Sequence, residues 1–398
     1  MSADVIVVGA GVAGASTAFH LSRLGAGDVL VVDRDTAGSG MSSRSSAMIR
    51  MHYTFRPEVE LAVRSDRMFD DWTALTGRPR FVRRTGFARI VLPGEESALR
   101  ANVAMQRYCG ARAEVLGAAA FAALAPGIRT EDLTEVAWEP DGGYGDGALV
   151  AGDLLAAARE RGVRYRPHTP VRALLRTGNR VTGIQTQDGP EHAGIVVAAA
   201  GVWSPALLAS IGVDLPIETE FHQVAVLSHG PGQGTPVACI DSTTQSYFRP
   251  EAGGTRTLVG SFTGPRGVDP DRIARPGLAP PSVPADDLAA LVGAAAKRLP
   301  ALAEAGIAHS VTGVYDMTPD GRPLLGQLPG LPGLVLAAGF SGTGFKISPA
   351  VGEAVAALVT GNPVTGSVDI GAFWPGRFAQ ERPVAPPFPY SDEDGGLH

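Results

Sequence analysis

The stretch that decides the fold is Asp4–Val8 (DVIVV), followed at once by Gly9-Ala-Gly11-Val-Ala-Gly14. A short, continuous apolar run predicts a strand that is buried on both faces of a parallel sheet. Residues 15–24 then carry apolar side chains at helical spacing, and a second apolar run, 29–32 (VLVV), ends at Asp33. Strand, glycine turn, helix and strand in this order predict one βαβ unit.

In such a unit the three glycines have separate roles. Gly9 allows the tight turn, Gly11 lets the backbone approach a pyrophosphate, and Gly14 lets the helix pack on the strand, while the helix N-terminus faces the phosphates. Asp33 stands where a carboxylate binds a ribose hydroxyl, which disfavours a 2′-phosphate and therefore NADP. The motif predicts a dinucleotide site against the alternative of an ordinary turn with a surface aspartate. It leaves FAD and NAD both open.

The composition excludes several classes of protein. With 398 residues, of which 44% are hydrophobic and 19% charged, the chain is neither disordered nor limited to one hydrophobic core. A net charge of -6 offers no basic surface for a nucleic acid. Cys109 and Cys239 are too few for a disulfide framework or a thiolate metal site, and the histidines have no ligand spacing. We therefore expect a cytoplasmic protein with no metal, no nucleic-acid partner and no membrane span.

The rest of the chain predicts an α/β fold with two domains. Helices are expected over 58–75, 95–108, 118–124, 152–161, 284–298 and 349–359, the last with Pro349 at its start. Strands are expected as a half-buried pair over 80–92, then over 171–187 with a turn at Gly178-Asn179, and over 194–200, 218–228, 237–241, 246–249, 257–262 and 334–338. The nucleotide-binding domain would comprise 1–79, 148–216 and 310–398, and the substrate domain 80–147 and 217–309. The proline-rich, acidic tail after Phe373 is expected to lie draped over the surface or to be mobile.

Six stretches then resemble one family. They are 9–14, Asp33, 43–53 (SRSSAMIRMHY), 200–204 (AGVWS), 315–320 (YDMTPD) and 338–346 (AGFSGTGFK). Together they resemble the D-amino-acid oxidase superfamily of flavoproteins and, within it, the sarcosine oxidases, both the monomeric enzyme and the beta subunit of the heterotetrameric one. The likeness spans nearly the whole chain. It implies a Rossmann-like FAD-binding domain with an inserted antiparallel-sheet α+β substrate domain, and the oxidation of an amino or secondary amino acid.

The resemblance also implies roles for single residues. Arg50 and Lys346 match the two cations that hold the substrate carboxylate, and Tyr247 and Tyr315 match active-site tyrosines. An arginine fork with a lysine point charge suits a carboxylate on chemical grounds as well. Lysine occurs in this chain only at Lys297 and Lys346. Because the residue type is so rare here, Lys346 in the glycine loop is expected to have a specific role. For Arg50 the alternative is a solvated surface side chain.

A catalytic base is not evident from the sequence. His52 and Tyr315 are the nearest candidates by motif, each with a packing or hydrogen-bonding role as the alternative. The residues expected to bind FAD are Gly9, Gly11, Gly14, Asp33, Arg34, Ser42, Ser43, Arg44, Ser45, Ser46, Val171, Ala200, Gly201, Trp203, Gly339, Gly342, Thr343, Gly344, Phe345 and Lys346.

Two departures from the family qualify this reading. Gly313 stands where the monomeric oxidase attaches its flavin to a cysteine, so the FAD is expected to be non-covalent. Leu258 stands where that enzyme has an oxygen-activating lysine, so O2 and another electron acceptor both stay open.

The predicted function is oxidation of a secondary or N-methyl amino acid, or a cyclic imino acid, to the imine by hydride transfer to flavin N5. The substrate would be a small anionic, amino-acid-like molecule. The alternatives are an α-hydroxy acid oxidoreductase of the same fold, and a flavin-bearing subunit with an assembly or electron-transfer role in a larger complex.

Overall fold

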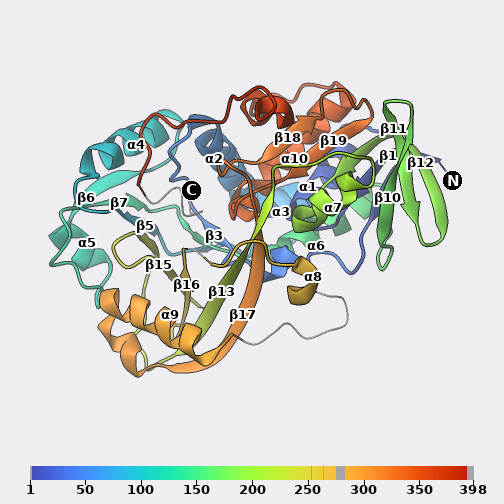
Figure 1. Ribbon diagram of the computed structural model, residues 1–398. Coiled ribbons are helices and arrows are strands. Elements are labelled where there is room, and N and C mark those ends of the chain that lie inside the picture. The colour runs from blue at the N-terminus through green and yellow to red at the C-terminus, as the bar shows by residue number, and fades with distance from the viewer. Residues whose placement is uncertain (1, 252, 263, 275–282, 392–398) are drawn as a thin grey trace.

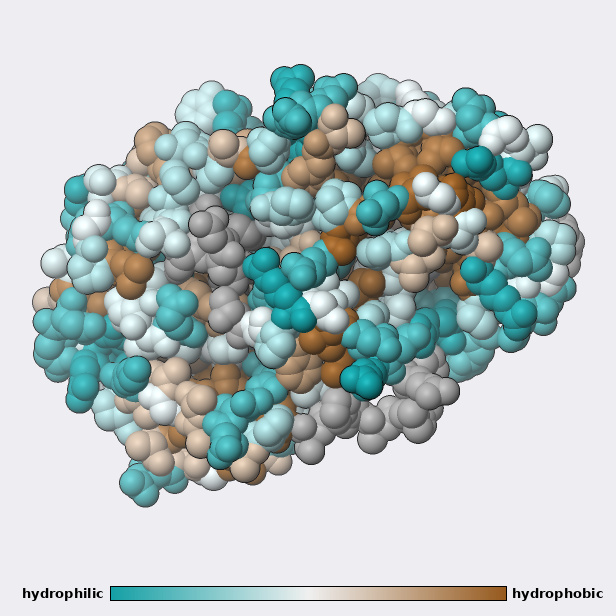
Figure 2. All heavy atoms as spheres, in the orientation of Figure 1, coloured by the Kyte–Doolittle hydropathy of each residue, from teal (hydrophilic) through white to brown (hydrophobic). Residues whose placement is uncertain are grey.

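The computed structural model describes residues 2–251, 253–262, 264–274 and 283–391. Within them two large sheets organise the chain, and each carries its own helices (Figure 1). In the view of Figure 1 the first sheet lies to the right, and the second sheet with α4, α5 and α9 extends along the left side and the bottom. Hydrophilic residues cover most of the face that Figure 2 shows, and hydrophobic residues reach the surface there in scattered groups.

The first sheet contains the predicted βαβ unit. Its strands are β1 (Ser2–Val8), β2 (Val29–Val32), β9 (Arg164–Arg166), β10 (Val171–Thr177), β11 (Arg180–Thr186), β12 (Gly189–Ala198), β18 (Leu324–Gln327) and β19 (Leu334–Ala338). The order is β10-β11-β12-β1-β2-β9, with β19 on β12 and β18 on β19. β1 runs parallel to β2 and β12, and β12 runs parallel to β19. Stretches that lie far apart in the sequence therefore end at one edge of one sheet.

Helices cover both faces of this sheet, which explains why its central strands are apolar throughout. Val5 and Val7 enter one hydrophobic core, while Ile6 and Val8 enter another on the opposite face. The first core is built with α1 (Val12–Arg23), α2 (Arg56–Asp70), α6 (Gly147–Glu160) and α10 (Gly344–Thr360). The second is closed by α7 (Ser204–Ala209).

The second sheet is antiparallel apart from one parallel pair, β5 with β14. Its order is β17-β13-β16-β15-β14-β5-β7-β6. The strands are β5 (Phe87–Ile90), β6 (Glu114–Gly117), β7 (Glu135–Glu139), β13 (Glu218–Ser228), β14 (Ala238–Asp241), β15 (Ser246–Pro250), β16 (Arg256–Ser261) and β17 (Gly306–Met317). α5 (Ala118–Leu124) and α9 (Ala285–Arg298) pack on one face, and α4 (Glu96–Tyr108) packs beside β6 and β7.

The predicted fold class, a Rossmann-like domain with an inserted antiparallel α+β domain, is thereby confirmed. A small third sheet of β3 (Met48–Ile49), β8 (Gly143–Tyr144) and β4 (Arg83–Arg84) accompanies the two large ones. The domain boundaries at 79, 147, 216 and 309 stay a prediction, and β17 runs across the last of them. Residues 1, 252, 263, 275–282 and 392–398 of the predicted domains lie outside the described residues.

The predicted strand pair over 80–92 is wrong. β4 and β5 do not pair with each other but belong to different sheets. Between them Gly86 has a φ of +75°, and a Cβ there would lie 1.8 Å from the Trp138 ring. The chain turns at this glycine because only a residue without a side chain fits beneath the indole. The predicted helix 58–75 is also divided, into α2 and α3 (Trp72–Thr76).

The last helix begins earlier than its proline suggests. α10 starts at Gly344, so Pro349 lies inside it and Lys346 lies in its first turn. Proline cannot donate the backbone hydrogen bond that the carbonyl of Phe345 would otherwise accept. The Ser348 hydroxyl donates to that carbonyl instead, at 2.9 Å. This replacement lets the helix continue through the proline.

The described part of the tail is anchored to the protein along α4. The Asn102 side chain donates to the Phe388 carbonyl at 2.9 Å, and the backbone N–H of Ser391 donates to Glu95 at 2.7 Å. Between them Tyr390 is 4% exposed. The acidic residues of 392–398 lie outside the described part. No helix in the described ranges is both long and apolar enough to cross a bilayer.

Candidate cofactor and substrate site

A cavity of about 390 Å³ connects the strand ends of the first sheet with the inner face of the second. From the first sheet it is lined by the ends of β1 and β2, by the start of α1 and by residues 199–203. The second sheet contributes residues of β13, β15 and β17, and the loop before α10 closes it. Ligands of open α/β sheets bind outside the carboxyl ends of the strands.

The glycine turn after β1 leaves no room for side chains. Gly9 has a φ of +103°, and a Cβ on it would lie 2.3 Å from the Ala199 carbonyl oxygen. A Cβ on Gly14 would lie 1.9 Å from the Gly9 carbonyl oxygen. Gly11 caps α1, and the first turn of this helix carries no acidic residue. A turn packed this tightly at a helix N-terminus fits a pyrophosphate, as the sequence predicted.

At the end of β2 the Asp33 carboxylate is held in place by backbone N–H groups, from Ala10 at 2.6 Å and from Asp35 at 2.8 Å. Burial raises the pKa of Asp33. Beside it the Arg34 guanidinium lies 4.7 Å from the centroid of the Trp203 ring. Asp33, Arg34 and Trp203 all line the cavity, so this end fits the ribose and adenine of a dinucleotide.

The other predicted residues divide into two groups. Those that also line the cavity are Gly9, Gly11, Ser42, Arg44, Ser45, Val171, Ala200, Gly201, Gly342, Gly344, Phe345, Tyr247 and Tyr315. Those that lie outside its lining are Gly14, Ser43, Ser46, Gly339, Thr343, Arg50, His52 and Lys346. Two residues of the second group make hydrogen bonds to residues of the lining. The Gly339 N–H donates to the Asp316 carboxylate at 2.8 Å, and the Thr343 hydroxyl donates to the Phe340 carbonyl at 2.7 Å.

Two tyrosines and a histidine form the wall on the side of the second sheet. The Tyr315 and His222 rings stack with centroids 3.6 Å apart, and the hydroxyl groups of Tyr247 and Tyr315 are hydrogen-bonded to each other. Burial raises the pKa of both phenols, so both stay protonated at neutral pH. Gly342 has to be a glycine here, because a Cβ on it would lie 2.9 Å from the Tyr315 ring.

His222 was missed from the sequence. It lines the cavity, and its Nε2 lies 3.0 Å from Glu220, which in turn accepts from Arg266 at 2.8 Å. Burial lowers the pKa of His222, with Glu220 opposing this effect. The alternation of residues 218–228 was visible in the sequence, but which face of the strand looks into the site depends on the register with β16 and β17.

Arg50 and Lys346 come from distant parts of the sequence and approach the same aromatic ring. The Arg50 guanidinium carbon lies 4.4 Å and the Lys346 Nζ 5.9 Å from the centroid of the same Tyr53 ring. Arg50 is 3% exposed, which excludes a solvated surface arginine. The Lys346 Nζ also donates to the carbonyl of Gly342, a residue of the lining, at 3.4 Å. Burial, with a contribution from the charge of Arg50, holds the pKa of Lys346 well below its usual range.

Burial and mutual repulsion disfavour the charged form of Lys346 here, so a bound anion that restores its proton would be favoured at this pair. His52 lies elsewhere: its Nε2 is 2.9 Å from the Tyr390 hydroxyl, and the two rings stack. Burial lowers the pKa of His52 well below its usual value. Its contacts are therefore with the tail and not with the cavity.

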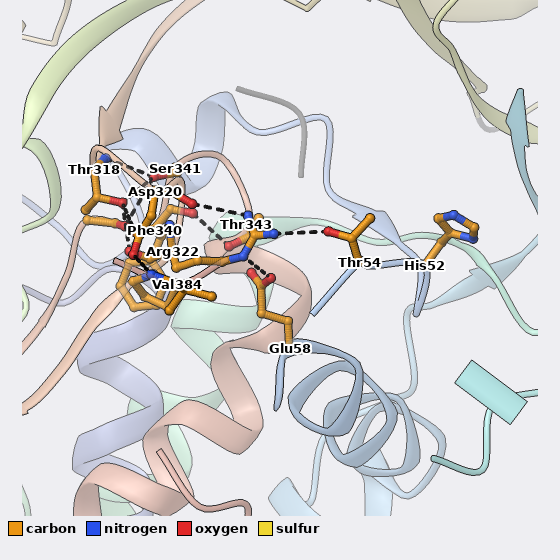
Figure 3. A network of polar contacts seen from close by, with 12 residues as sticks. His52, Thr54, Glu58, Thr318, Asp320, Arg322, Phe340, Ser341, Thr343 and Val384 are labelled. Atoms are coloured by element: carbon orange, nitrogen blue, oxygen red, sulfur yellow. Dashed lines mark hydrogen bonds and ion pairs between the residues drawn. The ribbon is translucent and has the colours of Figure 1, made fainter. Parts of the chain in front are cut away.

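A buried ion pair supports the segment that carries Arg50. Arg322 Nε lies 2.6 Å from the Glu58 carboxylate, and the two side chains are 1% and 0% exposed. Arg322 also donates to the Thr54 hydroxyl at 3.1 Å. Figure 3 shows these contacts converging between α2 and the chain before β18, with the His52 side chain pointing away from them. Arg322 thus joins Thr54, the next residue after Tyr53, to Glu58 of α2.

Removing one partner of this pair should destabilise the fold. We expect Arg322→Met to lower the free energy of unfolding by about 3 to 5 kcal/mol, because it leaves the Glu58 carboxylate buried without its counter-ion. Urea unfolding followed by tryptophan fluorescence measures this loss. Arg56→Met is the control, since Arg56 pairs with Glu60 at the surface and its loss should leave the free energy of unfolding nearly unchanged. Equal effects of the two changes would contradict the assignment.

Comparisons with known proteins agree with this geometry. The chain is 28% identical over 383 residues to 4-methylaminobutanoate oxidase (formaldehyde-forming) of Paenarthrobacter nicotinovorans, covering 92% of this chain and 45% of that protein. It is 27% identical to N-methyl-L-tryptophan oxidase of Salmonella heidelberg (strain SL476), covering 96% of this chain and all of that one. The chain thus spans less than half of the first relative's length.

Among solved structures, L-proline dehydrogenase from P. horikoshii has the same fold, with a TM-score of 0.84 over 96% of this chain and 99% of that one at 24% identity. The profile of the DAO family, described as FAD dependent oxidoreductase, matches residues 4–358. The resemblance seen in the sequence motifs is confirmed at this level. The chain belongs to the DAO family of FAD-dependent oxidoreductases.

Proposed function

We propose that this enzyme oxidises a secondary or N-methyl amino acid, or a cyclic imino acid, to the imine. The observation that carries the proposal is the buried pair of Arg50 and Lys346: both approach the Tyr53 ring, and Lys346 donates to the carbonyl of Gly342, which lines a cavity that fits FAD. The names of two relatives contain N-methyl amino acids, and that of the solved structure contains a cyclic imino acid, which supports the same substrate class.

The proposal assigns parts of the FAD to particular segments. The turn from Gly9 to Gly14 and the start of α1 suit the pyrophosphate, and Asp33 suits the ribose. The loop before α10 and the N-terminus of that helix suit the negative charge that the flavin ring gains on reduction. When bound, FAD supplies a hydride acceptor at N5. Gly313 lines the cavity and neither Cys109 nor Cys239 does, which supports non-covalent binding.

The protein's own groups would bind and orient the substrate. Arg50 and Lys346 hold its carboxylate, each charge-assisted hydrogen bond contributing roughly 1.5 to 3 kcal/mol. Tyr315 and Tyr247, both protonated, form the wall beside it and exclude water. The amine has to be neutral to give up a hydride, so we expect the rate of substrate oxidation to rise with pH.

Leu258 bears on the choice of electron acceptor. Leu258 is 5% exposed and packs in the same hydrophobic cluster as Tyr247. An aliphatic side chain supplies no charge to assist the reduction of oxygen, so O2 and another acceptor remain alternatives within the proposal. We also propose a cytoplasmic location.

An anaerobic substrate screen tests the proposal. The purified yellow protein is mixed with N-methyl amino acids, proline and related imino acids, primary amino acids and α-hydroxy acids, and the loss of flavin absorbance is followed. We expect saturable bleaching by N-methyl or imino acids, and the rate of recolouring in air then separates an oxidase from a dehydrogenase. Bleaching by α-hydroxy acids alone, or by no compound, would contradict the proposal; the second result would favour a subunit with an assembly role.

A further inference from the structure

Glu139 is a buried carboxyl group next to the segment that carries Arg50. Glu139 is the last residue of β7 and pairs with Phe87 of β5 across the second sheet. The Arg50 guanidinium carbon lies 5.9 Å from the centroid of that Phe87 ring. Directly paired residues of antiparallel strands present their side chains on the same face, so Glu139 and the Phe87 ring that Arg50 approaches lie on one face of the sheet.

A hydrogen bond links Glu139 to the segment that carries the cation. Its Oε2 accepts from the backbone N–H of Met51 at 2.8 Å. Met51 lies between Arg50 and His52, and an Arg50 N–H donates to the His52 carbonyl. The carboxyl group therefore fixes the backbone of the residue that follows Arg50.

The other oxygen of the same group is unusual. Glu139 is 0% exposed, and Oε1 makes no hydrogen bond with any residue in the described ranges. Burial raises the pKa of Glu139 to about 8, against the opposing effects of the Met51 N–H and of Arg50. The further charged groups that face it are Asp66 of α2 and Asp141 of the following loop, and both favour its protonated form. Glu139 is thus mostly neutral at pH 7 and gains a charge in mildly alkaline solution.

We propose that Glu139 is a positioning residue for the substrate carboxylate: it holds the Arg50 segment through Met51, and the loss of its proton weakens anion binding at Arg50. This inference rests on the proposed function. A second carboxylate beside Arg50 competes for the guanidinium and repels the incoming anion. Ligand binding above about pH 8 therefore requires that Glu139 take up a proton, and the Kd should rise toward tenfold per pH unit there.

The test uses a ligand with a carboxylate but no amine. (Methylthio)acetate is the thioether analogue of N-methylglycine; it neither titrates between pH 6 and 10 nor gives up a hydride from an amine-bearing carbon. Its Kd is measured with the FAD-loaded protein from the change in the visible flavin spectrum. We expect a constant Kd below about pH 7 and a rise above about pH 8, accompanied by proton uptake that a pH indicator detects.

Two glutamine variants separate the possible causes. Glu139→Gln keeps an acceptor for the Met51 N–H but has no proton to lose, so its Kd should stay constant where the wild-type value rises. Glu135→Gln is the matched control, because Glu135 lies in the same strand, pairs with Arg100 near the surface and should leave the pH profile unchanged. If Glu139→Gln retains the full rise, the loss of the Lys346 charge is the cause and the inference is overturned.

A third variant tests the positioning role by itself. Glu139→Leu removes the acceptor for the Met51 N–H, so we expect weaker binding of (methylthio)acetate at every pH with FAD still bound. Unchanged binding would overturn this role. A pH-independent wild-type Kd would contradict the inference while leaving the proposed function intact, whereas the absence of any spectral change would remove both.

Discussion

A Lys346→Met variant is expected to bind carboxylate ligands about 10- to 100-fold more weakly than the wild type while retaining its FAD. The change removes one charge-assisted hydrogen bond, worth roughly 1.5 to 3 kcal/mol, and tenfold in Kd corresponds to about 1.4 kcal/mol. Methionine nearly matches the length of the lysine stem, so the packing against Tyr53 is retained. Titration of the flavin spectrum at pH 6.5 measures the Kd, and the absorbance of the purified protein measures FAD content.

The chain provides its own control for this change. Lys297 is the only other lysine and lies exposed near the end of α9. Lys297→Met should leave the Kd and the FAD content unchanged. Equal affinities of the Lys346→Met variant and the wild type would remove the cation pair from the account.

A Gly14→Ala variant is expected to lose most of its FAD. The added Cβ would lie 1.9 Å from the Gly9 carbonyl oxygen, which is backbone and cannot rotate away, so α1 has to shift from the turn that would hold the pyrophosphate. Such overpacking costs about 1 to 3 kcal/mol in stability. We expect at least tenfold weaker FAD binding by the apoprotein, measured from the quenching of flavin fluorescence.

Gly152→Ala is the matched change. Gly152 is also a helical glycine, in α6, but a Cβ there meets no atom within 4 Å. Alanine is the better helix former, so this variant should be as stable as the wild type or more stable, with unchanged FAD affinity. If both variants retain FAD equally, the glycine turn is not the pyrophosphate site.

The parts of the fold that could be predicted are those whose signal is local. The strand, glycine turn, helix and strand from Asp4 to Asp33 lie where the sequence indicated, because buried parallel strands and tight turns restrict the allowed residues strongly. The strand Glu218–Ser228 matches to the residue. The start of α10 could not be predicted, because the Ser348 hydroxyl takes over the hydrogen bond that Pro349 cannot make.

The parts that could not be predicted depend on contacts between distant segments. His222 lines the cavity and Glu139 lies opposite Phe87 because of strand register, which alternation within one strand does not reveal. His52 has the right motif, yet its partner is Tyr390, 338 residues further along the chain. The family resemblance predicted that Arg50 and Lys346 bind the substrate carboxylate. Only the fold shows that both side chains are buried against the Tyr53 ring.

The central claim is that the substrate is held through its carboxylate beside the flavin. Anaerobic mixing of the FAD-loaded protein with the best amine of the screen, as the free acid and as its methyl ester, tests this claim most directly. The ester keeps the reacting amine and lowers its pKa, so more of it is in the neutral, reactive form. We expect the acid to reduce the flavin saturably and the ester to be at least about 100-fold less efficient, corresponding to roughly 2.7 kcal/mol of lost binding. Reduction by the ester as efficient as reduction by the acid would contradict it.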